Sequence, residues 1–248
     1  MLSKNQLKLI QALELKKQRK KHGLFLVQGE KNVAELMASD FTIESIFATA
    51  SYINKNSALL AEKGLLNIIF AATENELSKA GTLISNNSVV AVAECKTHEV
   101  PIIGKHELIL VLDQVGDPGN LGTIIRVADW YGIKRIVCSP ECADFYNPKV
   151  IAATMGSFAR VQVSHTPLSA YLSQQNRPIY GAFLEGENIH QAQLADSAFI
   201  VMGSESHGIS DEVGEFISDK ITIPNFGMAE SLNVAMATGI ILDNFKRS

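Results

Sequence analysis

Short segments that are almost entirely apolar alternate with helical segments in the second half of the chain. The clearest are residues 107–113 and 198–203, whose interiors contain no charged side chain and therefore offer no solvated face. Strands of this type belong to parallel sheets, because helical crossover connections cover both faces of such sheets. The sequence therefore predicts an α/β fold with a mostly parallel sheet in this part of the chain.

The alternation predicts two domains. In the second half we expect strands also at 135–139, 159–163, 179–184 and 220–224, and helices at 121–131, 148–155, 168–175, 211–217 and 231–246. The first half predicts a smaller α/β unit with helices at 3–21, 29–38, 51–63 and 74–80 and strands at 24–28, 43–48, 67–70 and 88–94. Residues 95–106 lack periodicity and contain Pro101 and Gly104. The predicted organisation is a domain at 1–94, a linker at 95–106 and a domain at 107–248.

Composition excludes several classes of protein. With 46% apolar and 19% charged residues, the chain is neither disordered nor collagen-like. Three cysteines make a disulfide framework improbable and favour a reducing compartment. No apolar run approaches the ~18 residues of a membrane span, and the first residues lack a signal-peptide core. We therefore expect a cytoplasmic protein with no membrane partner and, because Cys138 and Cys142 make a poor metal site, no metal.

Positive charge is concentrated at the start of the chain. Residues 1–31 hold eight Lys and Arg side chains against two Glu, a net charge of +6, while the rest of the chain carries −10 of the total of −4. Such a basic segment can bind nucleic acid phosphates. A charge run is also typical of the solvated face of an ordinary helix, and charge alone favours that interpretation. The basic cluster consists of Lys16, Lys17, Arg19, Lys20 and Lys21.

Three segments follow predicted strands, where parallel sheets bind ligands. In the first, at 113–126, we expect Asn120 to cap the following helix. Arg126 has apolar sequence neighbours, so its guanidinium needs an anionic or carbonyl partner or a structural salt bridge.

The second and third segments are equally ambiguous when taken alone. Residues 201–208 place Gly203 and Gly208 around Glu205, which suits close backbone approach to a ligand but also an ordinary tight turn. His207 could act as a base, but a histidine in a loop is more often solvated. In residues 223–235 we expect Ser231 to open the last helix, either as a simple cap or, with Asn233, as part of a site.

Together the three segments resemble the SpoU/TrmH family of RNA ribose 2′-O-methyltransferases, within the SPOUT superfamily. The pattern, in order, is Asn120-x-Gly122-x-x-x-Arg126, Gly203-x-Glu205-x-x-Gly208, Ile223-Pro224 and Ser231-Leu232-Asn233-Val234. The match covers residues 107–248. Ala152 departs from it, since many members carry Arg there, and this weakens an expected RNA-backbone contact. Residues 1–94 are more loosely similar to the family's substrate-binding domain, whose fold resembles ribosomal RNA-binding proteins.

The resemblance implies a function and assigns roles. The donor would be S-adenosylmethionine without a metal, and the acceptor a ribose 2′-OH of structured RNA, ribosomal more than transfer RNA, rather than DNA. Family members form homodimers and carry a C-terminal trefoil knot. The implied donor-binding residues are Gly203, Ile223 and Leu232; the implied catalytic residues are Asn120, Arg126, Glu205, Ser231 and Asn233. Because a guanidinium stays protonated, we expect Arg126 to anchor the RNA rather than to accept the hydroxyl proton.

Three alternatives are weighed against this interpretation. A dinucleotide-dependent enzyme would need the GxGxxG spacing, which the loop between Gly116 and Gly122 lacks. A non-catalytic RNA-binding or ribosome-assembly factor on the same scaffold stays open, as does methylation of an RNA base instead of the ribose.

Overall fold

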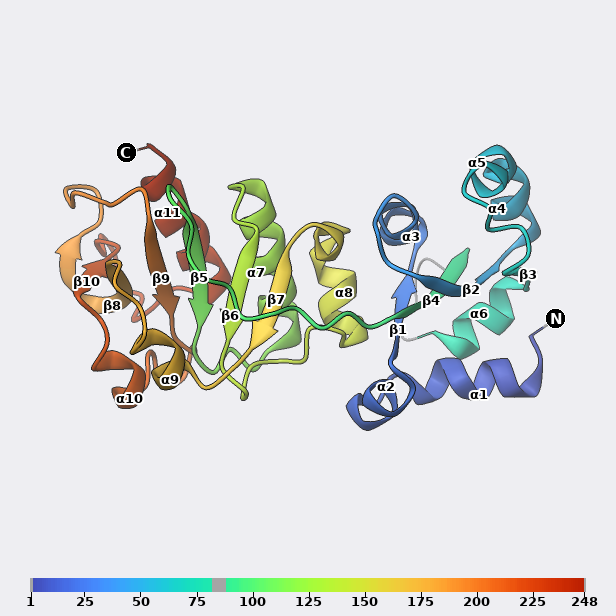
Figure 1. Cartoon of the computed structure of the whole chain (residues 1–248), viewed down its shortest axis with the longest axis horizontal. Coiled ribbons are helices and arrows are strands. Elements are labelled where there is room, and N and C mark those ends of the chain that lie inside the picture. The colour runs from blue at the N-terminus through green and yellow to red at the C-terminus, as the bar shows by residue number, and fades with distance from the viewer. Residues whose placement is uncertain (1, 82–87, 248) are drawn as a thin grey trace. The chain divides into compact units, whose positions relative to one another are not determined.

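The computed structural model describes residues 2–81 and 88–247, which form two compact units (Figure 1). Unit 1 comprises Met1–Lys96 together with Asp144–Ala159, and unit 2 comprises Thr97–Ala143 together with Arg160–Ser248. Within the described ranges, no helix has both the length and the apolar character that a membrane span requires.

Unit 2 is built on a six-stranded sheet in the order β10-β8-β9-β5-β6-β7, and every neighbouring pair is parallel. This confirms the predicted parallel sheet. The central strand β5 pairs with β6 on one side and β9 on the other. The strands are β5 (Leu108–Leu112), β6 (Arg135–Cys138), β7 (Gln162–His165), β8 (Ile179–Asn188), β9 (Ala198–Met202) and β10 (Asp219–Thr222).

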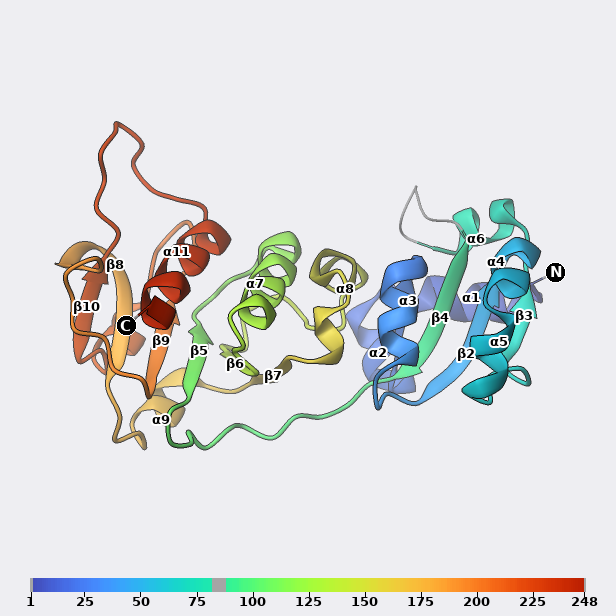
Figure 2. The ribbon, with the colours of Figure 1, turned by 90° about the horizontal axis from the view of Figure 1, so that it is seen from above.

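Helices cover both faces of this sheet. Helices α7 (Pro118–Trp130) and α11 (Val234–Arg247) pack against each other on one face, and α9 (Leu168–Leu172) lies on the other (Figure 2). Side chains of α9 and of α10 (Asp211–Gly214) join a buried cluster with Ile109, Val111, Phe199 and Val201. The strands read as continuous apolar segments because both of their faces are buried.

Unit 1 has a four-stranded sheet in the order β1-β4-β2-β3. Strand β4 is antiparallel to β1 and β2, and β3 is parallel to β2. The strands are β1 (Leu24–Gln28), β2 (Ile43–Ala48), β3 (Ile69–Ala71) and β4 (Val89–Glu94). The helices are α1 (Lys4–Ala12), α2 (Lys16–His22), α3 (Glu30–Met37), α4 (Ala50–Lys55), α5 (Ser57–Glu62) and α6 (Glu74–Ala80).

A segment from the middle of the chain completes unit 1. It contains α8 (Pro148–Thr154) and the 3-10 turn η1 (Ser157–Ala159), and α8 packs against β1. The rings of Tyr146 and Phe158 lie 4.6 Å and 6.2 Å from the ring of Phe25. The Tyr146 hydroxyl donates to the Lys96 carbonyl at 2.8 Å. This segment lies in the sequence range expected for the C-terminal domain, but its contacts belong to unit 1.

Several predicted element boundaries are wrong for local reasons. The helix expected at 3–21 is interrupted between Ala12 and Lys16, where the Arg19 guanidinium binds the backbone carbonyls of Leu13 and Glu14. The helix expected at 51–63 divides at Asn56, whose side-chain amide donates to the Tyr52 carbonyl at 2.9 Å. The strand expected at 159–163 begins only at Gln162, because η1 occupies the preceding residues.

Candidate active site

The first site segment turns directly into α7. Asp117, not Asn120, is the helix cap, since its carboxylate accepts the Asn120 N–H at 2.8 Å and Pro118 occupies the first helical position. The prediction that Asn120 caps the helix is therefore wrong. This arrangement leaves the Asn120 side-chain amide available for contacts with other loops.

The loop after β9 is a narrow turn that only glycine permits at its base. Ser204 and Gly208 exchange two backbone hydrogen bonds, at 3.0 and 2.9 Å. A Cβ atom on Gly203 would lie 2.0 Å from the Gly208 carbonyl carbon, which is sterically impossible. Gly208 itself has φ +69°, a conformation that disfavours other residues. The two glycines thus form a turn that carries Glu205, exposed, between them.

Three predicted catalytic side chains meet, one from each segment. The Asn120 side-chain amide donates to the Glu205 carboxylate, and the Asn233 amide donates to Asn120 Oδ1 at 2.9 Å. Asn233 Oδ1 in turn accepts the Ala235 N–H at 3.0 Å and so orders the first turn of α11. The predicted helix start at Ser231 is therefore wrong, because α11 begins at Val234 after this Asn233 contact.

A cleft of about 1200 Å³ opens beside these loops. Its lining combines apolar side chains with exposed carboxylates, which suits a ligand that has an apolar body and positive charge. The described parts of the chain contain no cluster of His, Cys, Asp and Glu suited to a metal ion. Five of the predicted site residues line the cleft: Gly203, Glu205, Ile223, Ser231 and Leu232.

One wall of the cleft was missed by the sequence reasoning. Strand β8 pairs with β10 in two registers, with Gly181 opposite Lys220 but Glu187 opposite Ile221. The residues between these two registers, including Phe183, Leu184 and Glu185, line the cleft. The order of the strands would have predicted this wall. Strand β8 lies between β9 and β10, and the loops that follow β9 and β10 carry the motifs.

Two predicted catalytic residues stand apart from the linked amides. Arg126 is exposed on α7, and among the described residues its guanidinium has no hydrogen-bond or ion-pair partner. The expectation that it lies among apolar groups is wrong, since its apolar sequence neighbours turn to the other side of the helix. Ser231 is exposed in the stretch before α11 and reaches the site only as part of the cleft lining.

Residues 107–243 match the model of the SpoU rRNA methylase family. The chain belongs to this family. Residues 4–93 match an MRM3-like substrate-binding domain.

Known proteins align with nearly the whole chain. The 23S rRNA (guanosine(2553)-2′-O)-methyltransferase RlmP of Bacillus subtilis is 27% identical, with 93% of this chain and 91% of the relative covered. A solved protein of the TrmH family from Porphyromonas gingivalis is 34% identical, with a TM-score of 0.87 and coverage of 100% and 99%. A solved AdoMet-bound rRNA methyltransferase from Sinorhizobium meliloti is 26% identical, with a TM-score of 0.86 and coverage of 100% and 96%.

In this SpoU family member the basic cluster divides into two kinds of residue. Lys16, Lys17, Lys20 and Lys21 are exposed on α2, and the described residues provide them with no ion-pair partner.

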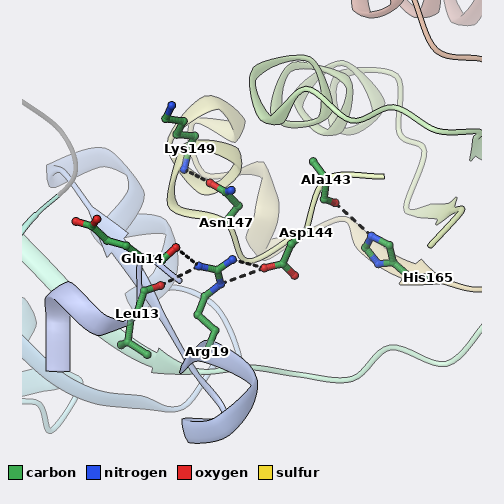
Figure 3. A network of polar contacts seen from close by, with 8 residues as sticks. All are labelled: Leu13, Glu14, Arg19, Ala143, Asp144, Asn147, Lys149 and His165. Atoms are coloured by element: carbon green, nitrogen blue, oxygen red, sulfur yellow. Dashed lines mark hydrogen bonds and ion pairs between the residues drawn. The ribbon is translucent and has the colours of Figure 1, made fainter. Parts of the chain in front are cut away.

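Arg19 has the opposite environment and is only 3% exposed (Figure 3). Its guanidinium donates to the Leu13 carbonyl at 2.8 Å, to the Glu14 carbonyl at 2.7 Å and to the Asp144 carboxylate at 3.0 Å. These contacts hold the backbone between α1 and α2 in its non-helical path. The assignment of Arg19 as an RNA contact is thus corrected: its donors are committed within unit 1.

Proposed function

We propose that this protein transfers the methyl group of S-adenosylmethionine to a ribose 2′-OH of ribosomal RNA. The observation that carries the proposal is the chain of contacts from Asn233 through Asn120 to Glu205 at the rim of the cleft, in a member of the SpoU family. The names of the relatives support ribosomal RNA and the ribose as acceptor. The chemistry needs no metal, because the sulfonium of the donor already makes its methyl group electrophilic.

The cleft is the proposed donor site. Gly203, Ile223 and Leu232 line it and would hold the donor through backbone groups and apolar contact. The lining has three carboxylates, of Glu185, Glu205 and Glu230, against the one ammonium of Lys220, and this excess of negative charge complements a sulfonium and an ammonium group. The AdoMet-bound relative from Sinorhizobium meliloti, which shares the fold over the whole chain, supports this assignment.

The remaining side chains would position the acceptor. The linked amides of Asn120 and Asn233 hold the Glu205 turn in place, and Ser231 would orient the incoming hydroxyl. Arg126 has free donors with which to bind the RNA phosphate and ribose. Alignment of two reactants can lower a barrier by ~7–11 kcal/mol, so a strong base is not required.

RNA would be recognised by unit 1. Four of its exposed lysines, Lys16, Lys17, Lys20 and Lys21, lie on one short helix without carboxylate partners among the described residues. The match to a substrate-binding domain supports this role for residues 4–93. We propose the division of the sequence at 1–94, 95–106 and 107–248 on the same basis, with Asp144–Ala159 as a part of the last region that packs in unit 1.

We also propose a homodimer formed through α7 and α11. Trp130 is 85% exposed and Met236 is 63% exposed, on two helices that pack against each other. Exposed apolar groups on neighbouring helices favour burial by a partner, and a second copy of the chain provides one. Sedimentation analysis should therefore give a dimer, which Trp130→Ser weakens. The family resemblance adds the trefoil knot, and a ribosomal RNA substrate favours the cytoplasm.

Methyl transfer from labelled S-adenosylmethionine to RNA tests the proposal. We expect label in ribosomal RNA and, at the modified nucleotide, a linkage that resists alkaline and nuclease cleavage, because a 2′-O-methyl group blocks it. Label at a cleavable linkage would indicate base methylation instead. RNA binding without transfer would identify a non-catalytic assembly factor, and label restricted to transfer RNA would change the substrate.

A further inference from the structure

Asp113, directly after β5, is a buried carboxylate outside the residues assigned above. It is only 2% exposed, and the described part of the chain gives it no ion pair. A carboxylate in such a position is costly unless hydrogen bonds compensate for the lost water. The groups that bind it therefore indicate what it does.

Asp113 holds both ends of one loop. Its backbone N–H donates to the carbonyl of Met202, the last residue of β9, at 2.9 Å. Its carboxylate accepts the N–H of Ser210, the cap of α10, at 2.7 Å. The residues between these two contacts, 203–209, form the turn that carries Gly203 and Glu205, which we call the donor loop.

Asp113 is itself held firmly from the opposite side. The preceding carbonyl, of Leu112, accepts the Ser139 N–H at 2.9 Å and the Cys142 thiol at 3.2 Å. The following N–H, of Gln114, donates to the Ser139 hydroxyl at 3.0 Å. Because the backbone on both sides of Asp113 is fixed to the segment after β6, its carboxylate is a rigid anchor for Ser210.

We propose that Asp113 is a positioning residue that sets the shape of the donor loop. By fixing the distance between Met202 and Ser210 it would keep Gly203 in the cleft lining and Glu205 within reach of Asn120. This inference rests on the proposed function of the cleft as the donor site. Asp113 would touch neither substrate and would act only through the loop.

Substitutions at the two ends of the carboxylate contact test this role. Asp113→Ala leaves the Ser210 N–H without a partner, and we expect the Kd for S-adenosylmethionine, measured by calorimetry, to rise about 10-fold, equivalent to about 1.4 kcal/mol. Asp113→Asn retains an acceptor oxygen of the same shape, so the Kd should stay within about 3-fold of wild type.

Ser210 provides a test that leaves the carboxylate in place. Its φ of −64° suits proline, and its side chain makes no cap hydrogen bond. Ser210→Pro removes the donated N–H and places a ring carbon against the Asp113 carboxylate, so it should raise the donor Kd at least as much as Asp113→Ala does. Ser210→Ala keeps the N–H and should bind the donor as wild type does.

Glu107→Ala is the matched control for a general loss of stability. Glu107 precedes the other end of β5, where it accepts the Gly104 N–H at 2.8 Å and the Arg135 guanidinium at 2.7 Å. We expect this variant to melt at a lower temperature with an unchanged donor Kd. If Asp113→Ala and Ser210→Pro also kept the wild-type Kd, the positioning role would be overturned. Failure of the wild-type protein to bind S-adenosylmethionine would instead overturn the proposed function itself.

Discussion

Helices α2 and α7 each carry one arginine, and the two arginines have opposite environments. In α2, Arg19 is 3% exposed and its guanidinium is bound by two backbone carbonyls and by Asp144. In α7, Arg126 is exposed, and no described residue binds its guanidinium. From the sequence neighbours alone, Arg19, which lies among lysines, would be expected to be exposed. Arg126, which lies among apolar residues, would be expected to be buried.

The difference shows that an arginine is available to a ligand only if the fold leaves its donors free. A guanidinium has five N–H donors, and a buried one must use them internally to offset its desolvation. Arg19 therefore contributes to the stability of unit 1, whereas Arg126 can bind an anion from outside. The two residues should respond to substitution in different assays.

The largest expected effect is the loss of methyl transfer in Arg126→Ala. Removal of one positioned donor commonly lowers a rate 10²–10³-fold, so we expect a loss of about 100-fold or more. Donor affinity and thermal stability should be unchanged, because the side chain is exposed and makes no hydrogen bond or ion pair with the described residues. Labelled methyl transfer and calorimetry measure the two quantities. Arg177→Ala, at another exposed arginine, is the control, and a lost donor affinity in Arg126→Ala would contradict the assignment.

Next in size is the loss of folding stability in Arg19→Met. Breaking a buried ion pair costs about 3–5 kcal/mol, and the lower end applies here because Asp144 is 22% exposed. Denaturant unfolding of the full chain should therefore show a loss of about 3 kcal/mol. The control is Arg160→Met, which breaks a pair with Asp129 whose arginine is 47% exposed and should cost less than about 1 kcal/mol. Equal losses in the two variants would refute the distinction.

The smallest effect on the folded protein is expected for the four lysines of α2. Their replacement by serine should reduce the slope of RNA affinity against salt concentration by about three, since each phosphate contact contributes ~0.7–0.9. Thermal stability should change little, because all four side chains are exposed. A matched variant removes four other exposed lysines of unit 1: Lys4, Lys8, Lys63 and Lys79. If both variants had the same salt slope, α2 would be an ordinary solvated helix.

The sequence was sufficient to predict the region of the site. Motifs after β5, β9 and β10 must lie at the same edge because the strands are parallel, and their loops meet there as expected. The link between Asn120 and Asn233 joins residues 113 positions apart, and no local pattern encodes it.

Other features depended on contacts that no local pattern shows. Arg19 is buried and binds Asp144, which is 125 residues away, whereas its lysine neighbours in the sequence favour a solvated helix. Asn120 and Asp117 both suit a helix cap, and Pro118 at the first helical position decides in favour of Asp117. The β8 wall of the cleft arises from a change of register against β10, which depends on the partner strand.

The segment Asp144–Ala159 has a consequence for how the protein is made. Phe25 on β1 receives its aromatic neighbours Tyr146 and Phe158 only after 121 and 133 further residues have been synthesised. At 5–20 residues per second this is a delay of roughly 6–27 s. During that time the apolar side chains of β1 that pack against α8, Tyr146 and Phe158 stay exposed, and nascent unit 1 can aggregate. A fragment that ends at residue 96 should therefore need a chaperone to remain soluble.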